Sequence, residues 1–400
     1  MNRKILHIIL ILGACGLVLG LILLPWGQKD LPPTLTDPDP SSTEAVATLE
    51  NTLPSAQESY VAAVREFFAG KTLSVLGDSI STYQDISNGL GADNSNSTIR
   101  DNLHFYPRQI ARVAPEDTWW QLTADALGLR LLVNNSWSGA SVLKDSAGAF
   151  GAYQKRCVNL HDNTGENAGE KPDFILFFMG TNDYILSQAS LGRYEDLAMD
   201  TLIREVEGEV IEVIYEKPKT TMEAYAICLH KMQREYPQAR IYCVTMLPRM
   251  NYEEDHVACN EDFAKVAQVF DVCLVDGYSL GMENADPFLH YYFGDNVHPN
   301  KEGMLAISNG IISAMLKDNG FDTYGVSFDL EGVIPREGSC RSILPGESFV
   351  TELIPTDPNA TLHITVTMAG TDITEQSLQG NTVTIPTVTG EVTISAKMGN

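Results

Sequence analysis

The sequence is poor in basic residues. Its 27 lysines and arginines stand against 52 aspartates and glutamates, which gives a formal net charge of −25 at pH 7. Binding to DNA or RNA needs clustered lysine and arginine side chains, so this composition argues against a nucleic-acid partner. It also argues against tight docking of the soluble part on anionic lipid. The excess negative charge is explained most simply as a surface that keeps the protein soluble.

Closely spaced metal ligands are also lacking. The seven cysteines include no Cys-x-x-Cys pair, and no His-x-x-His pair accompanies them, so a zinc site is not expected. Cys228, Cys243 and Cys273 lie in apolar stretches and are interpreted as small core residues. A disulfide such as Cys157 to Cys259 would suit an oxidising compartment, but sequence alone cannot establish it.

The N-terminal segment, residues 1–27, contains one long apolar run. Arg3 and Lys4 precede this run, which extends over Ile5–Trp26. Its length suits a bilayer-spanning helix, and the preceding positive charges favour an anchor with the rest of the chain outside the cell membrane. Two alternatives stay open. One is secretion after cleavage of a signal peptide, although no good Ala-x-Ala site follows Trp26. The other is lipidation at Cys15.

The rest of the chain consists of three parts that differ in composition. Residues 28–54 are rich in Pro, Asp, Ser and Thr without apolar periodicity, which is typical of a linker. Residues 55–320 alternate short apolar strands with helical stretches, and this pattern predicts a parallel sheet with helices on both faces. Residues 325–400 are rich in Thr, Val, Ile and Gly, and their alternating segments predict a small all-β sandwich.

These patterns give bounds for the expected elements. In the α/β part, strands are expected at residues 72–76, 129–133, 173–179, 239–246 and 272–275. Helices are expected at residues 56–68, 118–127, 221–236, 260–270 and 302–316. A tight hairpin at 206–210 is expected inside an insertion near the site, and the C-terminal part should hold strands at 362–368, 382–386 and 391–395. Active sites of such sheets lie at the carboxyl ends of the strands.

Four polar loops fall at these positions. Ser79 stands in Gly-Asp-Ser directly after the first strand, where a tight turn would expose its hydroxyl. Gly139 and Asn182 follow the next two strands, and a backbone N–H and a side-chain amide there would suit an oxyanion. Asp295 and His298 have a spacing that lets the carboxylate hold an imidazole against a serine. Each loop alone also fits an ordinary turn, and the Asp-x-x-His pair also fits a metal pair or a helix cap.

Taken together and in this order, the motifs resemble those of the SGNH (GDSL-type) hydrolase superfamily over about Lys71 to Leu316. The resemblance implies a three-layer α/β/α fold of flavodoxin-like strand order, with no metal or cofactor. It implies ester hydrolysis through an acyl-enzyme on Ser79, with His298 as base and Asp295 holding the imidazole. The oxyanion would bind the Ser79 N–H, the Gly139 N–H and the Asn182 amide. The first block reads Gly-Asp-Ser-Ile rather than Gly-Asp-Ser-Leu, a change that conserves volume.

Several neighbouring residues receive secondary predictions. Asp78 and Asp183 are interpreted as carboxylates that brace loops through backbone N–H groups. Aromatic and imidazole side chains that follow the first motif are candidates for substrate contact, with a role in the core as the alternative for the tryptophan: Tyr83, His104, Tyr106 and Trp119. The C-terminal segment resembles the bacterial Ig-like modules of surface-bound proteins, which says little about a ligand.

These features predict an extracytoplasmic serine esterase that removes acetyl groups from a carbohydrate. Export, the linker, the β module and the aromatic residues favour an acylated glycan as partner, and the membrane would be contacted through the N-terminal helix alone. One alternative is a lipid esterase such as a lysophospholipase, although no long amphipathic lid is evident. The second alternative is a surface glycan-binding protein whose triad is vestigial.

Overall fold

The computed structural model describes residues 57–84, 105–106, 112–144, 151–163, 167–186, 190–208, 211–249, 254–280, 282, 290–339 and 341–399. The expected anchor at residues 1–27 and the linker at 28–54 lie outside these ranges. Within them, no helix has the length and apolar character needed to cross a membrane. A helix over residues 57–68 leads toward the first strand, close to the bounds expected from the sequence.

Five parallel strands form the central sheet. They are β1 (Thr72–Gly77), β2 (Arg130–Ser136), β3 (Phe174–Phe178), β6 (Arg240–Val244) and β7 (Cys273–Val275). All five residues of β3 are buried, because this strand lies in the middle of the sheet and is covered on both faces. The lateral order is β2-β1-β3-β6-β7, and every neighbouring pair is parallel. This is the flavodoxin-like order, so the predicted fold is confirmed.

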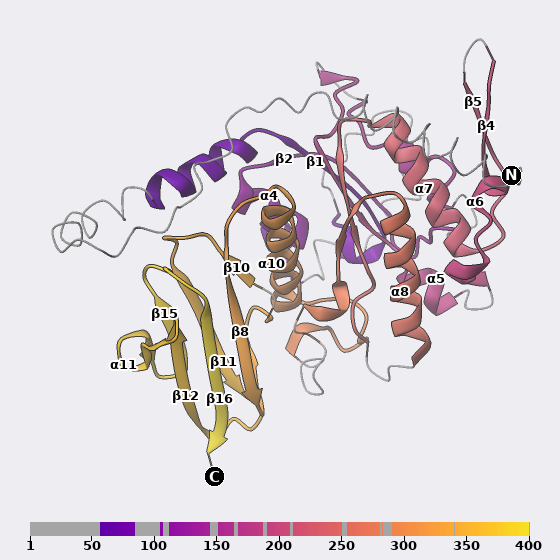
Figure 1. Ribbon diagram of the computed structural model, residues 1–400. Coiled ribbons are helices and arrows are strands. Elements are labelled where there is room, and N and C mark those ends of the chain that lie inside the picture. Colours follow the sequence, from indigo (N-terminus) through magenta and orange to yellow (C-terminus); the bar gives the residue numbers. More distant parts are fainter. Residues whose placement is uncertain are drawn as a thin grey trace, which may run out of the picture. The chain divides into compact units, whose positions relative to one another are not determined.

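Helices cover both faces of this sheet (Figure 1). On one side α4 (Trp119–Leu127) packs against α10 (Lys301–Asp318), and the buried hydroxyls of Thr123 and Ser308 lie 3.1 Å apart between them. On the other side α7 (Thr221–Glu235) packs against α8 (Glu254–Val269), with the rings of Tyr225 and Phe263 4.7 Å apart. The three-layer arrangement leaves the carboxyl ends of the strands free to carry loops.

In the α/β part, two element bounds differ from the sequence prediction by three residues or more, and both lie at asparagines with tertiary partners. Helix α8 begins at Glu254, not at the predicted Asn260. Asn260 lies inside the helix, and its amide bonds both the N–H and the carbonyl of Met246 at 3.0 and 2.9 Å. Strand β2 continues through Asn134 and Asn135 to Ser136, which pairs with Gly77 of β1.

The insertion between β3 and α7 contains short elements. They are α5 (Thr181–Leu186), α6 (Met199–Leu202), β4 (Ile203–Val206) and β5 (Glu212–Tyr215). Strands β4 and β5 form an antiparallel hairpin, as predicted, with a connection of residues 207–211 that is longer than the expected tight turn. The hairpin projects away from the central sheet (Figure 1).

The C-terminal β module, residues 324–399, consists of two sheets. One sheet has the order β10-β8-β16-β12-β13 and the other β14-β15-β11-β9. Their buried faces share one apolar core, which includes Phe349, Leu353 and Ile394. The predicted all-β sandwich is therefore confirmed. The module's elements are β8 (Tyr324–Glu331), β9 (Val333–Pro335), β10 (Arg341–Ile343), β11 (Phe349–Pro355), β12 (Thr361–Met368), β13 (Thr371–Asp372), α11 (Thr374–Ser377), β14 (Leu378–Gln379), β15 (Thr382–Ile385) and β16 (Val392–Gly399).

The cysteines in the described residues are free thiols. Cys157 and Cys259 are both unpaired, so the disulfide considered between them is wrong. Cys228 and Cys243 are buried core residues, as predicted, whereas Cys273 is partly exposed at the start of β7, the last strand of the sheet order.

Candidate active site

Ser79 lies directly beyond the carboxyl end of β1, at the start of a single 3-10 turn (Ser79–Ser81). Asp78 caps this turn, because its Oδ1 accepts a hydrogen bond from the Ile80 N–H at 3.0 Å. Gly77 is required for space: a Cβ atom there would lie 2.5 Å from Ser81 Oγ and 2.7 Å from Ser136 Oγ. The tight turn expected after the first strand is this single 3-10 turn. The amide of Ser79, as the first of that turn, has no partner within it.

His298 and Asp295 approach this serine from the loop before α10. His298 Nε2 lies 2.7 Å from Ser79 Oγ, and His298 Nδ1 lies 2.7 Å from Asp295 Oδ2. Asp295 Oδ1 also accepts hydrogen bonds from the N–H groups of Val297 and His298, each at 3.0 Å. These two backbone bonds fix the carboxylate, which in turn fixes the imidazole.

Burial shapes the protonation of this pair. It lowers the pKa of His298 below the ordinary 6.5, against the opposing effect of Asp295. Burial alone would raise the pKa of Asp295, but hydrogen bonds from the His298 and Val297 N–H groups and from the imidazole hold it below the ordinary 3.8. At neutral pH the pair therefore consists of a neutral imidazole and a carboxylate.

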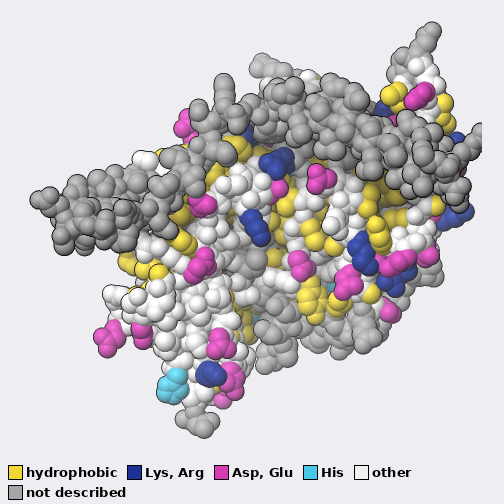
Figure 2. Space-filling view, viewed as in Figure 1, with side chains coloured by type: hydrophobic (Ala, Val, Ile, Leu, Met, Phe, Trp, Pro, Cys, Tyr) yellow, Lys and Arg dark blue, Asp and Glu magenta, His cyan; other side chains and the backbone are white. Residues whose placement is uncertain are grey.

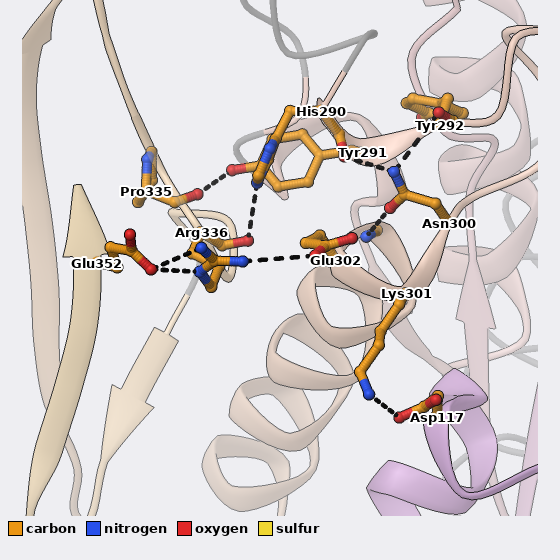
Figure 3. Close-up of polar contacts among 11 residues, drawn as sticks. Asp117, His290, Tyr291, Tyr292, Asn300, Lys301, Glu302, Pro335, Arg336 and Glu352 are labelled. Atoms are coloured by element: carbon orange, nitrogen blue, oxygen red, sulfur yellow. Dashed lines mark hydrogen bonds and ion pairs between the residues drawn. The ribbon is translucent and has the colours of Figure 1, made fainter. Parts of the chain in front are cut away.

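Several hydrogen bonds hold the catalytic loop, which we define as residues 290–300. Tyr292 and Pro299 form an isolated antiparallel bridge, and the Phe293 N–H donates to the His298 carbonyl at 2.9 Å. Asn300 caps α10 by accepting from the Gly303 N–H at 3.1 Å, and its amide donates back to the His290 carbonyl (Figure 3). The imidazole thus projects from a closed loop whose two ends are joined.

Gly139, in the loop after β2, and Asn182, in the first turn of α5 after β3, are the residues predicted as oxyanion donors. Strand register brings Gly77 beside Ser136 and Phe178, so the segments after β2 and β3 both start next to the turn that holds Ser79. Gly139 has a φ of +73°, which glycine adopts at little cost. One hydrogen of the Asn182 amide is used on the Ala140 carbonyl at 2.9 Å, which ties the two loops together.

Asp183 braces the loop after β2 and Asp78 braces the turn after β1, as predicted. Asp183 accepts from the N–H groups of Val142 and Leu143 at 2.8 and 3.1 Å and from the Thr221 hydroxyl at 3.0 Å. Burial raises the pKa of Asp183 to about 6, although these bonds oppose the shift. Burial also raises the pKa of Asp78 to about 7, against the bond from Ile80.

Arg156 is a buried cation next to the end of β1, before the turn that holds Ser79. This residue was not identified from the sequence. Its guanidinium donates to the carbonyls of Gly77 and Asn135 at 2.7 and 2.6 Å, and it lies 5.0 Å from the Trp137 ring. It therefore links the ends of β1 and β2. Arg156 begins a single 3-10 turn (Arg156–Val158) between β2 and β3, where no local sequence pattern distinguishes a buried arginine from a surface one.

Phe105 is a second residue that the sequence analysis missed. Its ring stacks on the His298 imidazole with 3.4 Å between centroids and an interplanar angle of 7°. This contact shields one face of the imidazole and contributes to its burial. The neighbouring aromatic positions suggested a role near the site, but they did not distinguish Phe105 from Tyr106.

The residues predicted to contact substrate mostly lie in the core. Tyr83, Tyr106 and Trp119 are buried, with at most 4% of their surface exposed. Tyr106 donates its hydroxyl to the Pro299 carbonyl at 2.8 Å, so it supports the catalytic loop. Their burial assigns these three side chains to packing rather than to a substrate surface, while His104 lies outside the described residues.

The described residues also bear on two other classes of site, a metal site and a basic surface. In the described part of the chain, no group of three or more His, Cys, Asp and Glu side chains is placed to hold a metal ion. Acidic and basic side chains are interspersed on the face shown in Figure 2. The described residues of that face form no continuous basic stripe of the kind that follows a phosphate backbone.

Comparison with known proteins gives one family match and several structural neighbours. The family model described as GDSL-like Lipase/Acylhydrolase matches residues 71–315. No curated protein matches the chain. A crystal structure described as a GDSL-like lipase from Bacteroides ovatus is 25% identical, with coverage of 62% of this chain and 99% of that chain and a TM-score of 0.42. A family two carbohydrate esterase from Cellvibrio japonicus is 15% identical, with coverage of 62% of each chain and a TM-score of 0.38.

Proposed function

Since the chain belongs to the GDSL-like lipase/acylhydrolase family and is an ester hydrolase, we propose that it cleaves acyl esters through a triad of Ser79, His298 and Asp295. The observation that carries this proposal is the continuous chain of hydrogen bonds from Ser79 Oγ through the imidazole to Asp295 Oδ2, each 2.7 Å long. The lowered pKa of His298 keeps its Nε2 available as a base at neutral pH.

The proposed mechanism follows from the positions of these groups. Ser79 Oγ attacks the ester carbonyl carbon while His298 Nε2 takes the hydroxyl proton, and Asp295 stabilises the imidazolium. The oxyanion accepts hydrogen bonds from the N–H groups of Ser79 and Gly139 and from the second hydrogen of the Asn182 amide. His298 then protonates the departing alcohol. Water attacks the acyl-enzyme in the same way, and the proton that it gives to His298 returns to Ser79.

We infer that the substrate is an acetylated carbohydrate. The support is a β module joined to the enzyme, an anionic chain that suits a neutral polysaccharide, and a sequence that shows no long amphipathic lid. A lipid esterase such as a lysophospholipase is the alternative, and it would require an apolar groove beside Ser79. The two differ in the length of the acyl chain that they accept.

We also propose that the enzyme works outside the cytoplasm, held by residues 1–27 or released from them. The support is the apolar run Ile5–Trp26 with Arg3 and Lys4 in front of it. Membrane fractionation of the full-length protein, together with sequencing of its mature N terminus, separates the anchored form from the secreted one. Recovery of the intact, uncleaved chain in the cytoplasmic fraction would contradict both.

The central experiment measures acetate release by the purified protein from acetylated xylan, mannan, pectin and peptidoglycan. Wild type should release acetate from at least one of them, and Ser79→Ala should abolish release. Ser395→Ala in β16 is the matched control, since it removes a serine hydroxyl from the β module. Ester hydrolysis that persists in Ser79→Ala would refute the proposed nucleophile.

Two further measurements decide between the alternatives. Hydrolysis of p-nitrophenyl acetate should exceed that of the octanoate, and a marked preference for octanoate would favour the lipid esterase. A fluorophosphonate probe should label Ser79 in wild type. If the probe failed to react while residues 325–400 bound glycan, the protein would be a glycan-binding protein with a vestigial triad.

A further inference from the structure

We propose that the C-terminal β module braces the catalytic loop, and that Tyr291 is the positioning residue through which it does so. The inference rests on the proposed triad, because the catalytic loop carries Asp295 and His298. It assigns the module a part in the reaction that does not depend on any ligand of its own.

Tyr291 lies at the base of the catalytic loop, where the chain enters and leaves. Its carbonyl accepts from the Asn300 N–H at 2.9 Å, which closes the loop just before α10. The same carbonyl packs into the first turn of α10, because a Cβ atom on Gly303 would lie 2.2 Å from it. A shift of Tyr291 would therefore move the loop and the helix start together.

The side chain of Tyr291 reaches the β module. Its hydroxyl donates a hydrogen bond to the carbonyl of Pro335, the last residue of β9 (Figure 3). The preceding His290 places its Nε2 3.4 Å from the Arg336 carbonyl. Tyr291 is completely buried, so its hydroxyl loses water on folding and depends on protein acceptors.

The acceptor is itself held firmly by the module. Pro335 pairs with Leu353 of β11, a residue of the module core. The Arg336 guanidinium lies within 2.7 Å of the Glu352 carboxylate and 3.5 Å from Glu302 in the first turn of α10. These ion pairs are partly exposed and add little energy, but they connect β11 to the helix that follows the catalytic loop (Figure 3).

The next residues of the module continue along α10. The Glu337 carbonyl accepts from the Asn309 amide at 3.1 Å, and the Ser342 N–H donates to Ser313 Oγ at 2.9 Å. Gly338 fits against the helix with no room for a side chain, since a Cβ atom there would lie 2.7 Å from the Ala306 Cβ. Residues 65–400 accordingly form one compact unit. The module is therefore packed against the enzyme and is not a free appendage.

Three tyrosine hydroxyls on proline carbonyls hold the loop. Tyr106 bonds Pro299 and Tyr292 bonds Pro248, each at 2.8 Å, and both pairs lie within the α/β region. The bond from Tyr291 is the one of the three that crosses to the β module. Because a small displacement of His298 from Ser79 slows proton transfer, loss of this bond should lower kcat more than it raises KM.

The test uses the full-length protein with Tyr291→Phe, which removes the hydroxyl and keeps the buried ring. We expect kcat to fall about fivefold, the factor that corresponds to the net contribution of one neutral hydrogen bond to stability. The KM should change less than about twofold. A looser loop exposes His298 more, so the acidic limb of the pH profile of kcat/KM should move to higher pH. Labelling by a fluorophosphonate should slow by the same factor as kcat.

Tyr242→Phe is the matched control. Its hydroxyl bonds the Asp318 carboxylate at 2.7 Å, at the opposite end of α10 from the catalytic loop. This variant should lose thermal stability and keep the kcat and pH profile of wild type. On the module side, Arg336→Ala should lower kcat in the same direction, and Arg336→Lys should restore part of it.

The outcomes separate this inference from the proposed function. If Ser79→Ala stayed active, the triad itself would fail. If Ser79→Ala were inactive while Tyr291→Phe kept the kcat and pH profile of wild type, the brace would be refuted and the triad would stand. A lower melting temperature for Tyr291→Phe without any change in kcat would equally refute the brace, because it would leave Tyr291 a structural role alone.

Discussion

Asp78 should make the stability of this enzyme depend on pH. Its carboxyl is fully buried beside Ser79, the proposed nucleophile, and burial raises its pKa from 3.8 to about 7. Oδ1 accepts from Ile80, but Oδ2 has no hydrogen-bond partner among the described residues. Asparagine has the same shape, keeps the acceptor for Ile80 and cannot ionise. Asp78→Asn therefore removes the charge with little change in packing.

The sign follows from the direction of the shift. A carboxyl whose pKa is higher in the folded state than in the unfolded state stabilises the fold while protonated, and this advantage is lost as pH rises through the folded pKa. A rise from 3.8 to about 7 corresponds to roughly 4 kcal/mol once both states are fully ionised, of which about 2–3 kcal/mol is lost between about pH 5 and about pH 8. The raised pKa of Asp183 also makes stability fall as pH rises, but Asp183 is present in wild type and in Asp78→Asn, so its effect cancels when the two are compared.

The assay is urea unfolding of wild type and Asp78→Asn at about pH 5 and about pH 8. The free energy of unfolding of the variant, relative to wild type, should rise by about 2–3 kcal/mol between the two conditions. Asp200→Asn, at an exposed position in α6, is the control and should show no such difference. If the difference between Asp78→Asn and wild type were the same at both pH values, Asp78 would not titrate as its burial implies.

Three other predictions follow from the site. The kcat/KM should rise with pH through an apparent pKa below 6.5, because burial lowers the pKa of His298, and a limb centred above 6.5 in the pH-rate profile would contradict this. Asn182→Ala should lower kcat about 100-fold with little change in KM, as loss of one oxyanion donor does, and an unchanged steady-state kcat would exclude the amide from that role. Trp119→Ala should destabilise the protein by about 3–5 kcal/mol in thermal or urea unfolding, while the folded enzyme keeps its KM. A raised KM at unchanged stability would instead show that Trp119 contacts the substrate.

The fold could be predicted from the sequence where a single physical effect, such as burial of both faces of a strand, determined which residues occur. Strand β3 is apolar throughout because both of its faces are buried, and its position was predicted within one residue at each end. The prediction placed the start of α8 six residues late, at Asn260, which lies inside the helix. The partner of the Asn260 side chain is the backbone of Met246, which becomes a neighbour only in the folded chain.

The site divides in the same way. The hydrogen-bonded arrangement of Ser79, His298 and Asp295 could be predicted, because the chemistry proposed for them needs particular residue types in particular loops. Arg156 and Phe105 could not, since each acts through a contact with a residue far away in the sequence. A buried arginine and an imidazole-stacking phenylalanine have no local pattern that separates them from other arginines and phenylalanines.

The position of β16 sets an order of events during synthesis. This strand pairs with β8 in parallel and with β12 in antiparallel orientation, so it lies inside its sheet although it is the last strand described. The sheet therefore cannot close until residues 392–399 have left the ribosome. Until then β8 and β12 each present an unpaired edge to the surroundings. Substitutions or proteolytic cuts that disturb residues 392–399 should therefore lower the yield of folded protein more than changes at a peripheral strand.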